Sequence, residues 1–301
     1  MTRLLLSFGH GYSARALTRL LTAQGGWQIH GTTRSAEKAQ AIAARGVTPH
    51  LMPGEDLTPL LDRATHLLIS AGPDAEGDPV LRHYGEVIGR NAARYDWVGY
   101  LSTTGVYGDH QGGWVDEATP LTPSTRRGRW RAEAEAAWRA IPGLPLHIFR
   151  LAGIYGPGRG PFAKVRAGRA RRIVKPGQVF SRTHVEDIAQ VLAASIARPN
   201  PGAAYNVCDD DPAPPQDVIT HAAALLNLAP PPVEEFATAE LTPMARSFYA
   251  ESKRVRNDRI KDELGVRLRY PDYRAGLAAL LSEEEAGADD RPSPADGDAA
   301  Q

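Results

Sequence analysis

The sequence predicts an α/β fold built on a doubly wound parallel sheet, and two observations support this expectation. An apolar run at the start of the chain ends abruptly at Gly9, and a segment with the apolar spacing of a helix follows from Ala14. Strand-like and helix-like segments then alternate through the first two-thirds of the chain. Such alternation is typical of parallel strands covered by helices on both faces, with ligands bound at the carboxyl ends of the strands.

The expected elements of this part follow from their composition and from the spacing of their apolar residues. The expected strands are Arg3–Phe8, Trp27–Thr32, Val47–Met52, His66–Ala71, Trp97–Thr103 and Leu146–Ala152. The expected helices are Ser13–Ala23, Ala36–Ala44, Val80–Tyr95 and Arg126–Ala140. Further along, a helix at Val185–Ala197 and a strand at Ala204–Cys208 are expected to rejoin the sheet.

The segment that joins the first strand to the first helix has the form G-x-G-x-x-A, which is the dinucleotide-binding fingerprint of a Rossmann-type sheet. Gly9 permits the tight turn, Gly11 lets the backbone approach a pyrophosphate, and the small Ala14 lets the helix pack closely on the strand. The start of the helix would offer free N–H groups and a positive dipole end. The predicted cofactor contacts in this loop are Gly9, His10, Gly11, Tyr12 and Ser13.

The end of the second strand predicts which dinucleotide is bound. NAD sites place Asp or Glu there to bind the ribose 2′-hydroxyl, whereas this chain has Thr33-Arg34-Ser35. Arg34 can bind a 2′-phosphate through two hydrogen bonds, and Thr33 or Ser35 can donate others. We therefore expect NADP(H) to be favoured, with NAD(H) possible. The alternative is that Arg34 is an ordinary solvated charge of the loop.

The remaining chain predicts a smaller lobe and a tail. We assign residues 1–208 to the nucleotide-binding domain, with an excursion toward the substrate side over about residues 156–181. Proline-rich loops mark residues 209–281 as a small substrate lobe. Residues 282–301 are acidic and almost free of large apolar side chains, so they are expected to form a disordered tail.

Composition excludes several classes of function. Lys and Arg together number 35, as do Asp and Glu, so no overall charge indicates nucleic-acid binding. The basic stretch 164–175 lacks interleaved aromatic residues, and it is interpreted as a solvated face or as an attractor for an anionic substrate. The single cysteine, Cys208, excludes an internal disulfide and a cysteine-based metal cluster. No apolar run is long enough to span a bilayer, so we expect a soluble cytoplasmic protein without a metal or a membrane partner.

Four further motifs carry a resemblance to a known family. They are Ser102-Thr103-Thr104-Gly105-Val106-Tyr107-Gly108, Arg150-Leu151-Ala152-Gly153-Ile154-Tyr155-Gly156-Pro157, His184-Val185-Glu186-Asp187-Ile188-Ala189 and Tyr205-Asn206-Val207. In this order, behind the glycine fingerprint, they resemble the NAD-dependent epimerase/dehydratase family, which belongs to the extended short-chain dehydrogenases/reductases. The resemblance covers roughly residues 3–280. The glycine spacing departs from the G-x-x-G-x-x-G of most members and is closer to that of the atypical branch.

The resemblance fails at one catalytic position. Family enzymes pair a Ser or Thr with Y-x-x-x-K, and Thr103 matches the Ser/Thr, which polarises a carbonyl. The register of the downstream motif places Arg127 at the Tyr position and Arg131 at the Lys position. Arg131 can replace Lys as a cationic cofactor ligand, but the guanidinium of Arg127 stays protonated and cannot replace the Tyr proton shuttle. Either Tyr155 or His184 could supply the proton, or Arg127 acts by stabilising an oxyanion or by holding an anionic group.

The resemblance implies further contacts. Asp56 matches the position that contacts the adenine, and Ala71 with Gly72 would line the adenosine side of the cofactor. Tyr155 is assigned to the catalytic site with Thr103, Arg127 and Arg131. The predicted substrate contacts are Tyr107, Arg159, Arg182 and His184.

These features predict an NADP(H)-dependent oxidoreductase that acts on a small, anionic carbonyl or alcohol substrate without the usual Tyr. Epimerisation or dehydration of a nucleotide sugar also fits the family. The alternative is a non-catalytic sensor of the NADP(H) redox state that acts through a protein partner. A homodimer formed through helices such as Val80–Tyr95 and Arg126–Ala140 is expected by analogy with the family.

Overall fold

The computed structural model describes residues 3–289 and confirms the predicted fold class. Its centre is a parallel sheet with the strand order β11-β7-β5-β4-β1-β2-β3, in which every neighbouring pair is parallel. The bounds are β1 Arg3–Phe8, β2 Trp27–Thr33, β3 Thr48–Leu51, β4 His66–Ile69, β5 Trp97–Thr103, β7 Leu146–Leu151 and β11 Ala204–Val207. The order reverses between β1 and β4, and in doubly wound sheets such a reversal opens a ligand crevice at the carboxyl ends of the strands.

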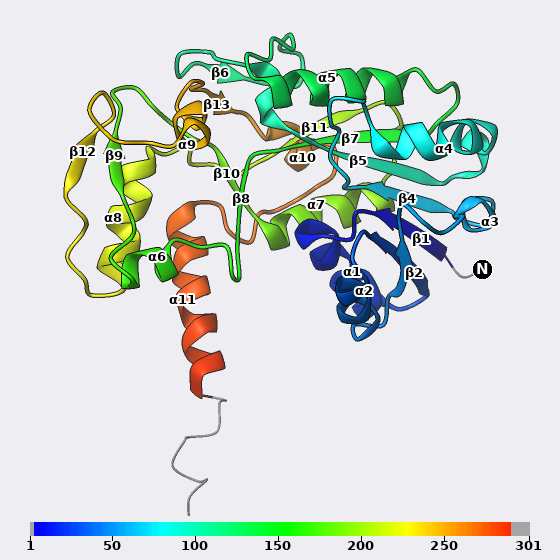
Figure 1. Cartoon of the computed structure of the whole chain (residues 1–301), viewed down its shortest axis with the longest axis horizontal. Coiled ribbons are helices and arrows are strands. Elements are labelled where there is room, and N and C mark those ends of the chain that lie inside the picture. The colour runs from blue at the N-terminus through cyan, green and yellow to red at the C-terminus, as the bar shows by residue number, and fades with distance from the viewer. Residues whose placement is uncertain (1–2, 290–301) are drawn as a thin grey trace, which may run out of the picture.

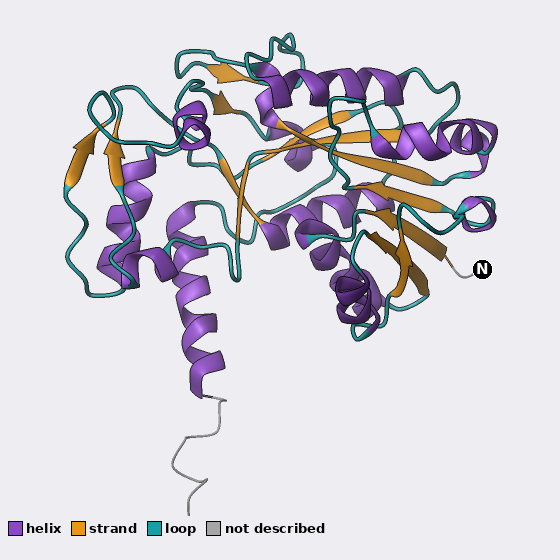
Figure 2. Cartoon of the chain, viewed as in Figure 1, coloured by secondary structure: helices purple, strands orange, loops and turns teal. Residues whose placement is uncertain are grey.

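Helices cover both faces of the sheet (Figures 1 and 2). One face carries α1 (Tyr12–Gln24), α2 (Ala36–Ala43) and α7 (Val185–Ala197); the other carries α3 (Thr58–Leu61), α4 (Pro79–Arg90) and α5 (Arg126–Arg139), with the short 3₁₀ helix η1 (Ala92–Arg94) after α4. Neighbouring strand residues alternate between the two layers: Leu5 packs on the α1 side, whereas Leu4 and Leu6 pack on the α4 side. Because both faces are covered, the central strands β1, β4, β5 and β7 are buried along almost their whole length.

A smaller lobe is built beyond the carboxyl ends of the strands. It contains β8 (Gly153–Tyr155), α6 (Phe162–Arg166), β9 (Arg172–Val174), β10 (Arg182–His184), α8 (Pro215–Leu225), β12 (Val233–Glu235), α9 (Pro243–Phe248) and α11 (Tyr273–Asp289). Its own core joins Tyr155 and Phe162 to side chains of α8 and to Leu277 and Leu280 of α11. The strands of the lobe pair in two separate ribbons, β10 with β8 and β12 with β9.

Two of the predicted domain boundaries differ from those in the structure. The lobe predicted for residues 209–281 is interrupted, because β13 (Arg254–Val255) pairs with β6 (Trp114–Val115) and α10 (Asp258–Asp262) packs on β11. Ile260 and Leu264 lie in the same core layer as α1 and α7. The predicted disordered tail starts too early, since α11 continues to Asp289. Its apolar side chains dock on the lobe as far as Leu281, and beyond them Glu284 pairs with Arg166; residues 290–301 lie outside the described residues.

The described helices include none that is both long and apolar enough to cross a membrane.

Candidate active site

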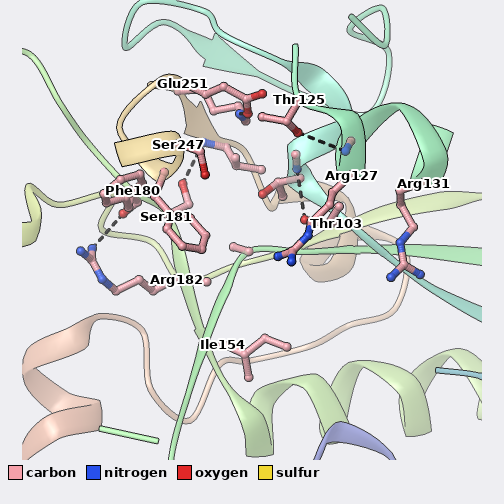
Figure 3. Close-up of a pocket in the computed structure, with 18 of the residues that line it drawn as sticks. Thr103, Thr125, Arg127, Arg131, Ile154, Phe180, Ser181, Arg182, Ser247 and Glu251 are labelled. Atoms are coloured by element: carbon pink, nitrogen blue, oxygen red, sulfur yellow. Dashed lines mark hydrogen bonds and ion pairs between the residues drawn. The ribbon is translucent and has the colours of Figure 1, made fainter. Parts of the chain in front are cut away.

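A cleft of about 980 Å³ opens at the carboxyl ends of the strands, between the sheet and the lobe. One wall comes from the end of β5, the 3₁₀ helix η2 (Thr104–Tyr107) and the first turns of α5. The opposite wall comes from residues 179–182 and 247–255. Figure 3 shows Thr103, Thr125, Arg127 and Arg131 on the first wall and Phe180 and Ser247 across from them.

The glycine loop has the geometry that a bound pyrophosphate needs. Gly9 has a φ of +77°, and a Cβ there would lie only 2.8 Å from the backbone nitrogen of Ala71. The N-cap of α1 is Gly11, which provides no side-chain cap, and the first turn of the helix carries no acidic residue. The first N–H groups of α1 are therefore available to an anion, and this loop fits the phosphates of a dinucleotide.

The other residues of the loop hold it in place. His10 is buried against Gly31, where a Cβ would lie 2.6 Å from the imidazole. Tyr12 donates a hydrogen bond of 3.0 Å to the carbonyl of Pro157, and the guanidinium of Arg159 lies 5.0 Å from the centre of its ring. Ser13 is also buried. The loop is thus tied to the segment after β8, and Arg159 packs on the cofactor loop.

The end of β2 leaves one cation without a protein partner. Ser35 caps α2 by accepting a hydrogen bond from the N–H of Lys38, and its own N–H donates to the hydroxyl of Thr33. Arg34 is exposed, and no carboxylate within residues 3–289 pairs with it. Asp56 is exposed after β3, where its carboxylate accepts a hydrogen bond from the N–H of Thr58.

Three predicted catalytic residues do lie together on one wall. Thr103 ends β5, and its hydroxyl accepts a 3.2 Å hydrogen bond from the N–H of Gly105. Arg131 donates to the carbonyl of Leu101 at 2.7 Å and to the hydroxyl of Tyr100 at 3.2 Å. Its guanidinium also lies 3.3 Å from the position that a Cβ of Gly72 would take, so it stands beside the loop that follows β4.

Arg127 points into the cleft beside Thr103 (Figure 3). Within the described part of the chain, no residue accepts a hydrogen bond from its guanidinium or forms an ion pair with it. A guanidinium carries five N–H donors and a permanent positive charge, so Arg127 presents an unused anion-binding group to the cleft.

A buried polar network holds this wall. Glu135 is fully buried on α5; its carboxylate accepts two hydrogen bonds from Arg150, of 3.2 and 2.9 Å, and one of 2.5 Å from the hydroxyl of Ser102. Arg150 also donates to the hydroxyl of Tyr107, which in turn donates to the side chain of Asn206. The network joins α5 to β5, β7 and β11, and it fixes the helix that carries Arg127 and Arg131.

The structure does not support four of the predicted contacts. One is Arg159, which lies over the ring of Tyr12 and is not among the residues that line the cleft. Tyr107 is fully buried in the network just described, so it cannot touch a substrate. Tyr155 borders the cleft, but its hydroxyl is turned toward α11, where it leaves no room for a Cβ on Gly276 and lies 3.5 Å from the carbonyl of Asp272. Burial raises the pKa of Tyr155, which further reduces its ability to release a proton.

His184 is 1% exposed and caps α7 by accepting a hydrogen bond from the N–H of Glu186. Its imidazole packs against Tyr155 and Tyr270, away from the cleft lining. The fourth predicted substrate residue, Arg182, does line the cleft, and it donates to the carbonyls of Phe180 and Ala213.

We expect His184 to be neutral at pH 7, because burial lowers its pKa from 6.5 to about 4. The unfolded chain then binds more protons between these two values, so the contribution of this group to stability is complete above pH 6.5 and is lost as the pH falls through 4. The loss is at most about 1.4 kcal/mol per pH unit in that window. An NMR titration of the imidazoles, assigned with His184→Asn, measures this pKa; a midpoint near 6.5 would contradict the burial.

Sequence reasoning missed much of the cleft. The unpredicted lining residues include Trp130, Phe180, Ser181, Phe248, Glu251 and Lys253. Lys253 donates to the carbonyl of Gly108 and to the carboxylate of Glu251. The basic stretch 164–175 is partly neutralised within the lobe, since Arg166 pairs with Glu284 and Arg171 pairs with Glu234.

A scan against protein-family models finds none that matches this chain. Among curated proteins, the chain is 30% identical to Protein YeeZ of Escherichia coli over 277 residues, which span 88% of this chain and 95% of that protein. Among solved structures, it is similar to a functionally unknown conserved protein from Silicibacter pomeroyi, with 65% identity, a TM-score of 0.90, and coverage of 94% of this chain and 100% of that one.

Two further structures extend the comparison. A protein from Methylobacillus flagellatus, proposed to be an NAD-dependent epimerase/dehydratase, is 28% identical with a TM-score of 0.70, covering 94% of this chain and 99% of that one. The human epimerase family protein SDR39U1, solved with NADPH, is 17% identical with a TM-score of 0.73, covering 93% of this chain and 99% of that one. The last likeness concerns the fold alone.

Proposed function

Because the chain belongs to the NAD-dependent epimerase/dehydratase family of short-chain dehydrogenases/reductases, we propose that it is an NADP(H)-dependent oxidoreductase acting on a small anionic carbonyl or alcohol substrate. The observation that carries this proposal is the grouping of Thr103, Arg127 and Arg131 on one wall of the cleft, next to a glycine loop shaped for a pyrophosphate.

Each residue of this wall has a distinct task. Arg131, fixed by the carbonyl of Leu101, binds the nicotinamide ribose in the place of the family Lys. The hydroxyl of Thr103 donates a hydrogen bond to the substrate oxygen and polarises the carbonyl. When bound, the cofactor supplies the hydride for reduction or accepts it in the reverse direction. The overall reduction consumes the carbonyl compound, NADPH and one proton, and yields the alcohol and NADP⁺.

Arg127 affects how the substrate oxygen receives its proton in the proposed reduction. A positioned general acid typically contributes about 10²–10⁴ in rate, and a guanidinium cannot supply that contribution at neutral pH. Arg127 instead stabilises the negative charge that develops on the substrate oxygen, or holds an anionic group next to it. The oxygen then takes its proton from water.

We expect Arg34→Ala to weaken NADPH binding by about 10-fold or more while leaving NADH binding unchanged. A charge-assisted contact with a phosphate contributes about 1.5–3 kcal/mol, and NADH lacks the 2′-phosphate that Arg34 would contact. Calorimetric titration of the wild-type and variant proteins with both cofactors measures the two affinities. Proteins of the same fold have been solved with NADPH and with NAD, so the proposed preference rests on Arg34 and on the missing carboxylate at the end of β2.

The matched control for this experiment is Lys38→Ala, which removes an exposed cation from the same helix start without removing Arg34. Equal loss of NADPH affinity in both variants would indicate a general charge effect and would count against a 2′-phosphate site. Failure of the wild-type protein to bind either cofactor would overturn the proposed function itself.

A second candidate function is favoured by the same Arg127. A cofactor-binding chain without the Tyr proton shuttle could report the NADP(H) redox state to a protein partner instead of turning over a substrate. Turnover of any carbonyl substrate by the wild-type protein would remove this alternative.

A further inference from the structure

The cleft has an aromatic side that the proposed reaction does not use. Trp130 from α5, Phe180 from the segment before β10 and Phe248 from α9 all line it. Phe248 is 61% exposed, which makes it the most exposed of the large apolar side chains that stand out from the surface. Together with the other two rings it offers apolar surface that a bound ligand would cover favourably. Val179 and Val255 add further apolar surface to the same space.

The charge in the cleft is positive and lies mainly at the α5 end. Arg126 lies over the ring of Trp130, 5.0 Å from its centre, and Arg127 has no described protein partner. The one lining carboxylate, Glu251, is already occupied: it accepts hydrogen bonds from Lys253 at 2.8 Å and from Ser124 at 2.5 Å. An entering ligand therefore meets the unpaired guanidinium of Arg127, and it meets no free carboxylate among the described residues that line the cleft.

The polar groups of the cleft are poorly suited to a sugar. Sugar hydroxyls are usually held by the side chains of Asp, Glu, Asn and Gln, which accept and orient several hydrogen bonds at once. Among the described residues that line the cleft there is no Asp, Asn or Gln, and the single Glu is engaged. The remaining neutral donors are the hydroxyls of Thr and Ser residues, with Thr103 assigned to the reacting oxygen.

We propose that the substrate is an aromatic carboxylic acid, whose ring packs against Trp130, Phe180 and Phe248 and whose carboxylate binds Arg127. This inference rests on the proposed function, because it names the substrate class of the same site. Aromatic contacts and a cation in an apolar cleft recognise a planar ring and an anion together. The reacting carbonyl or alcohol lies between the two anchors, within reach of Thr103 on the same wall as Arg127 (Figure 3).

The test uses the full-length protein saturated with NADPH and an unreactive probe, trans-cinnamate, titrated by calorimetry. Cinnamamide keeps the ring and removes the charge, 3-cyclohexylpropanoate keeps the charge and removes the aromatic ring, and UDP-glucose represents the nucleotide sugars. We expect trans-cinnamate to bind at least about fivefold more tightly than either single-feature analogue, because each anchor contributes separately. UDP-glucose binding more tightly than trans-cinnamate would overturn the proposal.

Two variants locate the anchors. Phe248→Ala should weaken the binding of trans-cinnamate about fivefold, and it should affect the binding of 3-cyclohexylpropanoate only through the loss of contact area. Arg127→Gln should weaken the binding of both acids at least about tenfold and leave the binding of cinnamamide unchanged. Trp114→Ala is the matched control, since Trp114 is 52% exposed but does not line the cleft. Both cleft side chains are exposed, so neither variant is expected to disturb folding.

The outcomes separate this inference from the proposed function. Normal NADPH binding with no preference for trans-cinnamate, or with equal losses in the Trp114 control, would overturn the aromatic-acid assignment and leave the oxidoreductase in place. Failure of the protein to bind NADPH would overturn the proposed oxidoreductase function. In that case, titration of the cofactor-free protein with trans-cinnamate would still test whether the cleft binds an aromatic acid.

Discussion

Replacing Glu135 with alanine is expected to lower the free energy of unfolding by about 3–5 kcal/mol. The carboxylate is fully buried and accepts hydrogen bonds from Arg150 and Ser102. Removing it leaves the guanidinium of Arg150, itself only 3% exposed, as an unpaired buried charge. Urea denaturation of the wild-type and variant proteins measures the difference.

Glu133 provides the control, because it lies two positions before Glu135 on the same helix and its side chain is exposed. Glu133→Ala should change the free energy of unfolding by no more than about 0.5 kcal/mol. A Glu135→Ala protein as stable as the Glu133→Ala protein would show that the network does not hold α5. The NADPH affinity of Glu135→Ala, if it remains folded, reports whether α5 also positions Arg131.

Replacing Arg131 with alanine is expected to weaken NADPH binding by about 10- to 100-fold. The side chain is anchored by the carbonyl of Leu101 and lies beside Gly72, on the cofactor side of the cleft. A hydrogen bond to a charged group contributes about 1.5–3 kcal/mol, which corresponds to this range of affinity. Calorimetric titration with NADPH measures the loss.

Two variants make this result specific. Arg131→Lys should recover most of the affinity, because an ammonium group also offers donors and positive charge to a ribose. Arg129→Ala removes an exposed cation from the same helix and should leave the affinity unchanged. An unchanged affinity in Arg131→Ala would mean that Arg131 serves only to bind the end of β5.

Local sequence was sufficient for the sheet and its helices. The apolar strands, the turn at Gly9 and the helical spacing after Ala14 each depend on neighbours in the chain, and the predicted strands agree with the structure to within a few residues. The end of α11 was predicted wrongly because its acidic composition is typical of a disordered tail. One of them, Glu284, is held by Arg166, more than a hundred positions away in the chain.

The site was harder to predict for the same physical reason. Thr103, Arg127 and Arg131 could be placed by motif spacing, because they lie close to one another in the chain. The aromatic side of the cleft could not, since Trp130, Phe180 and Phe248 come from three distant segments. The burial of Tyr107 and His184 depends on tertiary partners, so a motif that names these residues does not say whether a ligand can reach them.

At β13 and α10 the chain returns from the lobe to the nucleotide-binding domain, and this affects how the molecule divides into domains. Residues beyond the lobe complete the core of the nucleotide-binding domain, since Ile260 and Val266 pack in the layer with α1 and α7. The lobe is therefore not a separate domain at the end of the chain: the chain leaves the lobe after α9, completes the nucleotide-binding core at α10, and enters the lobe again in α11. A fragment that stops at Cys208 would expose this core layer to water. The unit that unfolds cooperatively, and that could be exchanged between proteins as a domain, is therefore the whole chain through α11.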